Sequence, residues 1–194
     1  MRLRRPLATL MATCAAIFAV VMAPTPARAD SWPGWKVWYI SVLKPANNGG
    51  ITRVLDVTGG SGANGTPVQL WQQASGNTVN TQQWGVRARA VRNNDTEYGY
   101  EIYNWGSGKC LDRRSDIPIG NGNPVQMWAC NPSTETVRPS QLWWAVKVGS
   151  SNWVMLKNGI DGRCLDVTGV SYSNGARLQA WDCSANWNQR WNIY

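Results

Sequence analysis

One sequence pattern occurs three times along this chain, and this repetition restricts the possible folds more than any other feature. Each copy opens with Leu-Asp and contains two Gln-x-Trp motifs. From the residue before Leu-Asp to the second residue after the first Gln-x-Trp motif, the copies read VLDVTGGSGANGTPVQLWQQ, CLDRRSDIPIGNGNPVQMWAC and CLDVTGVSYSNGARLQAWDC. Their aspartates, Asp56, Asp112 and Asp166, lie 56 and 54 residues apart. Three repeats, about 38–91, 92–148 and 149–194, therefore account for most of the chain.

Each repeat has the pattern of four short strands. Runs rich in Val, Ile, Trp and Tyr alternate with turns that contain Gly and Asn. The turn between the second and third strands always holds Asn-Gly, which suits positive φ: Asn64-Gly65, Asn121-Gly122 and Asn174-Gly175. One repeat cannot bury its apolar face alone, so three must close on one another. The expected fold is all-β, a β-trefoil of three pseudo-symmetric four-stranded repeats.

The first 29 residues have the pattern of a secretory signal peptide. Three arginines within the first five residues precede a mostly apolar run, which ends at an Ala-Arg-Ala cleavage motif. Twin-arginine export through Arg4-Arg5 is an alternative, but an ordinary positive leader is favoured. We expect a secreted, extracellular protein with a short arm, residues 30–37, and one domain, residues 38–194. No later run is long and apolar enough to span a bilayer.

Composition argues against several functional classes. The formal net charge is +8, but the leader holds four of the 19 basic residues and none of the 11 acidic ones, which leaves +4 for the mature chain. Its basic residues are scattered, whereas a nucleic-acid footprint would need a clustered patch. The chain has no histidine, so Ser-His and Cys-His dyads and histidine metal sites are excluded. We expect no nucleic-acid partner, no cofactor and no metal.

Four cysteines remain once Cys14 leaves with the leader. An even number in a secreted chain indicates disulfides. Three pairings are possible, and the repeats select Cys110–Cys130 and Cys164–Cys183. The first repeat has Val54 and Gln73 at the corresponding positions.

The Cys-Leu-Asp, Gln-x-Trp-x-Cys and closing Asn-Gln-x-Trp motifs together resemble the ricin B-type lectin family. Similar trefoil modules are attached to many secreted glycosidases. The resemblance covers essentially all of residues 38–194, with six Gln-x-Trp motifs at repeating offsets. It implies a carbohydrate-binding module in which the closing tryptophan of each repeat fills the trefoil interior. The aromatic residue of the earlier motif would stack on a sugar ring.

Twelve of the thirteen tryptophans therefore divide into classes. Those of the closing motifs begin apolar strands and are expected in the core: Trp84, Trp143 and Trp191. Those of the earlier motifs are expected to be sugar platforms, since an aromatic ring offers a large, rigid surface for the apolar face of a pyranose: Trp71, Trp128 and Trp181. Four others near strands are assigned to packing by default, and the two in the arm to the edge of the barrel: Trp38, Trp105, Trp144 and Trp153, then Trp32 and Trp35.

The family's sugar-binding set is Asp, Gln, aromatic, Asn and Gln. The third repeat matches it throughout, with Asp166, Gln179, Trp181, Asn188 and Gln189. A carboxylate accepts hydrogen bonds from two adjacent hydroxyls, and amides both donate and accept. A lone Leu-Asp would more simply form an Asx-turn, but its repeated occurrence with Gln and Trp favours a site. The loop TGVSYSNG, which includes Tyr172, is expected to govern the choice of sugar.

The other two repeats depart from this set. The first has Asp56, Gln69, Trp71 and Gln82, with Thr81 in place of the asparagine, and is expected to bind more weakly. The second has Asp112, Gln126, Trp128 and Gln141, with Ser140 in place of the asparagine and one extra residue between Asp and Gln. Arg113 and Arg114 follow its aspartate, and either can pair with that carboxylate and compete with a sugar. The second site is therefore ranked last.

We expect a monomeric lectin, without enzymatic activity, that binds galactosides or plant-type polysaccharides such as xylan or arabinan. Two alternatives stay open. One is a glycosidase with a carboxylate pair, which is disfavoured because an aspartate on a shallow surface lacks the burial that tunes a general acid. The other is a protein-binding trefoil, such as a protease inhibitor that uses residues 131–140, or the cell-binding part of a toxin.

Overall fold

The computed structural model describes residues 39–46, 49–76, 80–92, 97–132 and 136–194. The expected signal peptide, the arm and three tryptophans, Trp32, Trp35 and Trp38, lie outside the described residues. Within the described part, no helix is long and apolar enough to cross a membrane.

Twelve strands make up the described fold, four in each repeat, as the sequence predicts. The first repeat contains β1 (Ile40–Val42), β2 (Arg53–Val57), β3 (Thr66–Gln72) and β4 (Trp84–Arg92). The second contains β5 (Glu97–Asn104), β6 (Cys110–Arg113), β7 (Asn123–Trp128) and β8 (Leu142–Lys147). The third contains β9 (Val154–Asn158), β10 (Cys164–Val167), β11 (Leu178–Trp181) and β12 (Trp191–Ile193). Short 3₁₀ turns precede the last strand of each repeat, at Asn80–Gln82, Pro139–Gln141 and Trp187–Gln189.

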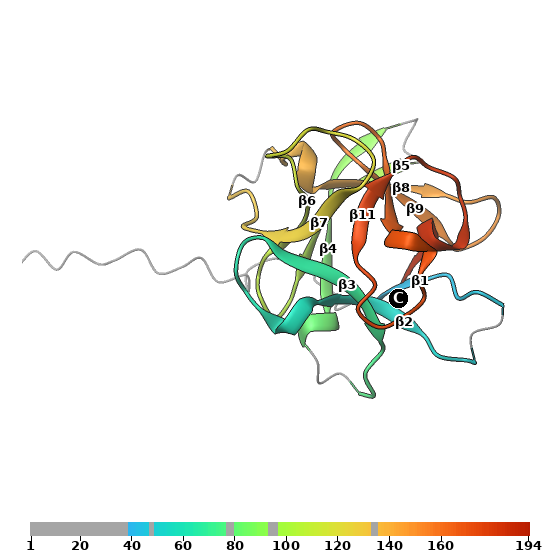
Figure 1. The fold of residues 1–194 in the computed structure, drawn as a ribbon. Helices are drawn as coiled ribbons and strands as arrows, with labels where there is room; N and C mark the ends of the chain where they lie inside the picture. Colours follow the sequence, from blue (N-terminus) through green and yellow to red (C-terminus); the bar gives the residue numbers. More distant parts are fainter. Residues whose placement is uncertain (1–38, 47–48, 77–79, 93–96, 133–135) are drawn as a thin grey trace, which may run out of the picture. The chain divides into compact units, whose positions relative to one another are not determined.

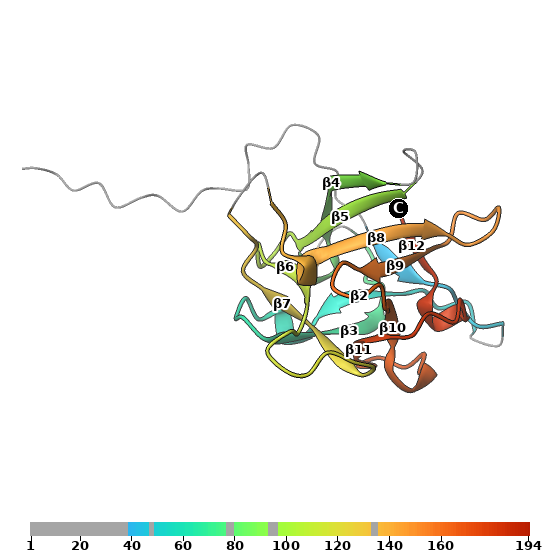
Figure 2. The ribbon, with the colours of Figure 1, turned by 90° about the horizontal axis from the view of Figure 1, so that it is seen from above.

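The strands form two sets that meet at the core (Figures 1 and 2). The first and last strands of the repeats, here called the outer strands, pair antiparallel in the order β1, β12, β9, β8, β5 and β4. The inner strands form three hairpins, β2–β3, β6–β7 and β10–β11. The hairpins contact one another in a ring: β3 pairs with β7, β7 pairs with β11, and Gln69 bridges Arg177 beside β11. This is the expected trefoil.

The three closing tryptophans, Trp84, Trp143 and Trp191, lie in the core and are 0% exposed. Each indole N–H donates to the carbonyl of the leucine on the second strand of its own repeat, at 3.1, 2.9 and 2.9 Å respectively. A buried indole needs such a partner. The core assignment of these tryptophans is confirmed.

Both predicted disulfides are present, with Cα–Cα distances of 5.0 Å for Cys110–Cys130 and 5.2 Å for Cys164–Cys183. The glycines of the three Asn-Gly turns adopt φ of 84°, 86° and 84°, as that pair predicts.

The default assignment of Trp105 to packing is wrong. Its side chain is 43% exposed. The reason is local: β5 ends at the buried Asn104, and Trp105 begins the turn that follows. Its ring retains one aromatic neighbour, Tyr103, at a centroid distance of 6.2 Å.

Candidate functional site

In all three repeats, the aspartate and the first glutamine face each other across a hairpin. The register pairs Asp56 with Gln69, Asp112 with Gln126 and Asp166 with Gln179. Directly opposed residues share a face of the sheet, so each amide Nε2 donates to the carboxylate Oδ1, at 3.0, 3.2 and 2.8 Å respectively. The extra residue of the second repeat lies in the hairpin loop and leaves this register unchanged.

The second carboxylate oxygen receives a donor from the 3₁₀ turn before the last strand. Thr81 Oγ donates to Asp56 at 2.9 Å, and Ser140 Oγ donates to Asp112 at 2.9 Å. In the third repeat, Asn188 Nδ2 donates to Asp166 at 2.6 Å. The shorter side chains of Thr81 and Ser140 therefore still reach their aspartates.

Asn188 differs from the two hydroxyl residues in one respect. Its side chain is buried, with 4% exposure, and its Oδ1 has no hydrogen-bond partner among the described residues. A buried acceptor left without a partner costs about 1–3 kcal/mol. The third site thus contains a hydrogen-bond acceptor that no described residue satisfies, on an atom that is covered from solvent.

The glutamines of the closing motifs, Gln82, Gln141 and Gln189, are buried to 1%, 0% and 1% exposure. Each Oε1 accepts a backbone N–H, and each Nε2 donates to a backbone carbonyl, in the segment that follows the exposed tryptophan. Gln189 Nε2 also lies 2.9 Å from Asp166 Oδ2. These amides hold the wall of each site, and direct contact between them and a sugar stays a prediction.

The three tryptophans of the earlier motifs are solvent-facing. Trp71, Trp128 and Trp181 are 43%, 37% and 43% exposed, whereas those of the closing motifs are fully buried. Each lies at or next to the end of its hairpin strand, β3, β7 or β11. Large rings that remain exposed at equivalent places are what stacking platforms require.

A pocket of about 560 Å³ lies at the third repeat, which we call the third site. All five predicted residues line it, together with the segments 168–170 and 182–184: Asp166, Gln179, Trp181, Asn188 and Gln189. A pocket of about 330 Å³ lies at the first repeat, the first site, and its lining includes Asp56, Trp71 and Gln82. The second site is the corresponding set around Asp112.

The aspartates are not shallow, which corrects the expectation used against an enzyme. Asp56, Asp112 and Asp166 are only 7%, 5% and 4% exposed. Burial raises the pKa of Asp166, and hydrogen bonds from Gln179 and Gln189 partly oppose this shift. Burial likewise raises the pKa of Asp112, against hydrogen bonds from its neighbours and the nearby Arg138 charge. Burial alone therefore does not exclude proton transfer by these carboxyls.

The expected competition of Arg113 and Arg114 for Asp112 is also wrong. Successive strand residues point to opposite faces, and Arg113 is fully buried on the other face, where it pairs with Asp161 and donates to Asn123 Oδ1 at 2.8 Å. Arg114 lies beyond the strand and pairs with Asp116 at 2.7 Å.

The loop TGVSYSNG contributes residues to the lining of two pockets. Thr168, Gly169 and Val170 line the third pocket. The second half of the loop contacts the first repeat. Tyr172 Oη donates to the carbonyl of Ile51 at 2.8 Å, and Asn174 lines the first pocket. That this loop governs the choice of sugar stays a prediction.

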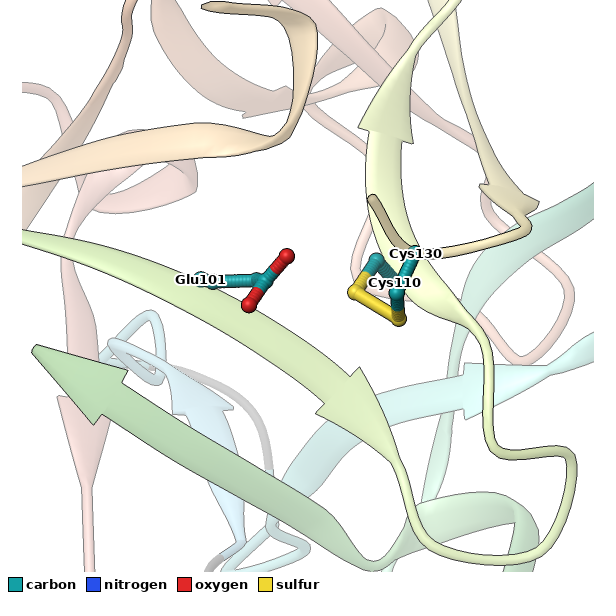
Figure 3. Close-up of side chains that lie close together, drawn as sticks. All are labelled: Glu101, Cys110 and Cys130. Atoms are coloured by element: carbon teal, nitrogen blue, oxygen red, sulfur yellow. A yellow bond between two sulfur atoms is a disulfide. The ribbon is translucent and has the colours of Figure 1, made fainter. Parts of the chain in front are cut away.

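One cluster of potential metal ligands occurs in the described part of the chain, formed by Glu101, Cys110 and Cys130 (Figure 3). The two sulfurs are joined in a disulfide, so neither is a thiolate. Glu101 forms an ion pair with Arg87. This chemistry does not suit a metal ion.

Comparisons with known proteins agree with the fold and the motifs. The family model described as "Ricin-type beta-trefoil lectin domain" matches residues 98–194, half of the chain. A second model, "Ricin-type beta-trefoil lectin domain-like", matches residues 35–128.

Among solved structures, the designed three-fold symmetric protein ThreeFoil is 25% identical, with 80% of this chain and 96% of that chain covered and a TM-score of 0.61. An exo-β-1,3-galactanase from Clostridium thermocellum is 25% identical, with a TM-score of 0.59; 81% of this chain is covered, but only 30% of the galactanase. The C-half of an earthworm R-type lectin, solved with GalNAc, is 19% identical, with 81% and 98% covered and a TM-score of 0.53. The lectin comparison shows the fold alone.

Proposed function

We propose, because the chain belongs to the ricin-type β-trefoil lectin domain family, that it is a secreted carbohydrate-binding protein whose principal sugar site is the third site. The observation that carries this proposal is the convergence of three groups in one pocket. They are the buried Asp166 carboxylate, the exposed Trp181 ring and the unpartnered Asn188 Oδ1 within the described residues.

These groups match the two faces of a sugar. The ring of Trp181 is a platform for the apolar C–H face of a pyranose. Asp166 has acceptor capacity beyond the amide bonds that it already receives, and Asn188 Oδ1 is an acceptor on a separate atom. Two acceptors beside one platform suit a sugar with neighbouring hydroxyls.

The first and second sites are proposed to be weaker. There the residue facing the second carboxylate oxygen is a hydroxyl, Thr81 or Ser140, whose oxygen is already bonded to the aspartate. The first pocket is also smaller, about 330 Å³ against about 560 Å³. The second aspartate lies within the field of Arg138.

The charges around the pockets favour uncharged sugars. Among the described residues, no Lys or Arg lines the first or the third pocket, while Asp166 and Asp182 both line the third. An anionic sugar would be repelled there. Galactosides, or neutral plant polysaccharides such as xylan or arabinan, fit this chemistry. GalNAc in the earthworm lectin and the galactanase that carries a similar domain support the same class.

We propose no catalytic role for the chain. A glycosidase needs two carboxyls that flank the scissile bond, one of them a proton donor. In the third pocket, both Asp166 oxygens accept amide protons, and Asp182 pairs with Arg163 at 3.1 Å. Both carboxylates are thus engaged as acceptors. No contact of the described residues favours the protease-inhibitor alternative, and residues 133–135 of its loop lie outside them.

A glycan array with the mature protein, followed by titration of the best neutral sugar, tests this proposal. Trp181→Ala should weaken binding by about tenfold or more, since it removes the platform. Trp105→Ala is the matched control, because Trp105 is equally exposed but lies in a turn outside the pockets. Absence of wild-type binding to any glycan, or an equal loss in both variants, would contradict the proposal.

A further inference from the structure

The backbone beside each of the three platform tryptophans, Trp71, Trp128 and Trp181, is bonded to a turn from a different repeat. The three inner strands β3, β7 and β11 lie side by side (Figure 1), so the hairpin turn of one repeat reaches the next. The turn Asn121-Gly122 of the second repeat reaches the strand end that carries Trp181. Gly122 N–H donates to the carbonyl of Ala180 at 3.0 Å, and Asn121 Oδ1 accepts the N–H of Asp182 at 2.9 Å.

The same pair of bonds from an Asn-Gly turn, which we call the clasp, joins the backbone on both sides of Trp71, the first platform. Gly175 N–H donates to the carbonyl of Leu70 at 2.8 Å, and Asn174 Oδ1 accepts the N–H of Gln72 at 2.7 Å. The residues just before and after Trp71 are thus both bonded to the third repeat.

The second platform completes the ring. Gly65 N–H donates to the carbonyl of Met127 at 2.8 Å, and Asn64 Oδ1 accepts the N–H of Ala129 at 2.9 Å. The first repeat therefore holds Trp128, the second holds Trp181, and the third holds Trp71.

Arginine strengthens this clasp at two of the three sites. Arg163, which precedes the third Leu-Asp strand, donates through Nε to Asn121 Oδ1 at 2.7 Å. Arg53, at the equivalent place in the first repeat, bonds Asn174 Oδ1. The second repeat has Lys109 at this position, and a lysine lacks the planar fork of an arginine.

The clasp also reaches the pockets themselves. Asn121 Nδ2 donates to the carboxylate of Asp182 at 2.8 Å, and Asp182 lines the third pocket. Asn174 and Gln72 both line the first pocket. Gly122 lies close to two residues of the proposed sugar site, since a Cβ added there would be 3.9 Å from the Trp181 ring and 4.0 Å from Gln179 Oε1.

Backbone pairing alone does not explain this arrangement. The glycine N–H bonds continue the pairing between strands, but the asparagine bond is made by a side chain and is repeated at all three sites. This side-chain bond fixes the backbone beside the tryptophan ring. The ring is 43% exposed at the first and third sites, so fewer packing contacts constrain its position there.

We infer that the turn asparagines are positioning residues of the sugar sites, each serving the site of another repeat: Asn121 the third site, Asn174 the first and Asn64 the second. The inference rests on the proposed function for its effect on sugar binding. No single repeat then forms a complete site. Asn174, although it belongs to the repeat with the best sugar-binding set, controls the first site.

A crossed experiment tests this assignment. The third-site protein carries Trp71→Ala and Trp128→Ala, and the first-site protein carries Trp128→Ala and Trp181→Ala. Asn121→Ala and Asn174→Ala are placed in each, with Asn152→Ala, in the turn between β8 and β9, as the control. Retention on immobilised galactose and on immobilised arabinoxylan is measured for all of them.

Asn121→Ala should weaken the third-site protein by about tenfold, and much more than it weakens the first-site protein. Asn174→Ala should give the reverse. A purely structural asparagine would affect both proteins alike. Equal effects in the two proteins, or none, would overturn the inference, provided that the wild type is retained.

Amide hydrogen exchange separates this inference from the proposed function, because it needs no sugar. Asn121→Ala should speed exchange at the Asp182 amide but not at the Gln72 amide, and Asn174→Ala should do the opposite. If the wild type binds neither matrix, the proposed function loses its support, while the exchange pattern still decides the clasp. Unchanged protection at both amides would overturn it.

Discussion

One residue separates three otherwise similar groups of side chains. Each buried aspartate accepts the amide of the glutamine across its hairpin, and Asp166 in addition accepts the amide of an asparagine, Asn188, where Asp56 and Asp112 accept a hydroxyl. A hydroxyl that donates to an aspartate keeps its acceptor lone pairs on the same atom. The amide keeps its acceptor on a separate atom, which is buried and unpartnered among the described residues.

Asn188→Ser tests this distinction, since the second repeat shows that a serine in this position still reaches its aspartate. The variant should keep its stability and lose the separate acceptor, with sugar affinity of the third site weakened by about 1 kcal/mol. Isothermal titration and thermal unfolding measure the two quantities. An unchanged affinity would show that the free oxygen does not bind the ligand.

Because burial raises the pKa of Asp166, we expect the proposed sugar affinity of the third site to be sensitive to acid. Burial shifts this pKa upward from 3.8, and an ionised carboxylate is the stronger acceptor for sugar hydroxyls. Affinity of the third-site protein should therefore fall on acidification with a midpoint above 3.8. Titrations from neutral pH into the acid range measure it, and a midpoint at or below that value would contradict this account.

The stability of the folded protein should depend on pH in the opposite direction, because the contribution of Asp166 to stability is larger in acid. A carboxyl whose pKa is raised on folding stabilises the folded protein below its ordinary pKa, and this contribution is lost as the pH rises through the folded-state pKa. Asp166→Asn removes this dependence and serves as the control for unfolding measured across the same range.

At the scale of strands and loops, the segment after β11 forms one wall of the third pocket. Two of its attachments lie within the third repeat: the disulfide joins Cys183 to the start of β10, and the Gln189 amide bonds Asp182 and Ser184. The first repeat has the corresponding glutamine, Gln82, but has no cysteines to form a disulfide at its wall. The disulfide therefore adds rigidity to the site with the complete residue set.

Replacing Cys164 and Cys183 by alanine should lower the free energy of unfolding by about 3 kcal/mol, as expected for a loop of this length. It should also weaken sugar binding at the third site. Removal of Cys110–Cys130 is the matched control, with a similar loss of stability and less effect on the third site. Urea unfolding and sugar titration measure both. Equal binding losses in the two variants would argue against a local role for the disulfide.

At the scale of the whole molecule, the trefoil presents three related sites on one rigid body. Single shallow sugar sites are weak, because they exchange hydrogen bonds with water for similar ones with protein. Several sites on one body raise the effective affinity for a polymer without any new contact. The repetition that builds the fold thus also provides a route to tight binding.

The wild type should exceed the third-site protein on a densely glycosylated surface by about tenfold or more. With a free monosaccharide, the affinity of the third site should be the same in both proteins. Surface binding and calorimetry measure these two quantities. Equal retention on the dense surface would show that the first and second sites are inactive.

Features that recur in every repeat could be predicted from the sequence. The strands and the buried Trp84, Trp143 and Trp191 follow directly from the threefold period, and so does the approach of each aspartate to its glutamine. The two disulfides follow from the equivalent cysteines of the second and third repeats. Departures from the period were harder to predict. The orientation of Arg113 depends on strand alternation, and the exposure of Trp105 depends on where β5 ends.

The clasp between repeats could not be predicted from one repeat at a time. Asn121 and Asp182 are 61 residues apart and belong to different repeats. Only the closing of three hairpins into a ring brings a turn of one repeat beside the platform of the next. The Asn-Gly pair was readable as a turn, but its second role depends on the assembled trefoil.

A crystal structure of the mature protein with bound methyl β-galactoside tests the central claim most directly. The account predicts a sugar in the third pocket, with its apolar face on Trp181 and its hydroxyls within hydrogen-bond distance of Asp166 and of Asn188 Oδ1. A sugar bound only elsewhere, for example in the pocket of about 330 Å³ lined by Val86, Tyr100 and Ile193, would contradict it.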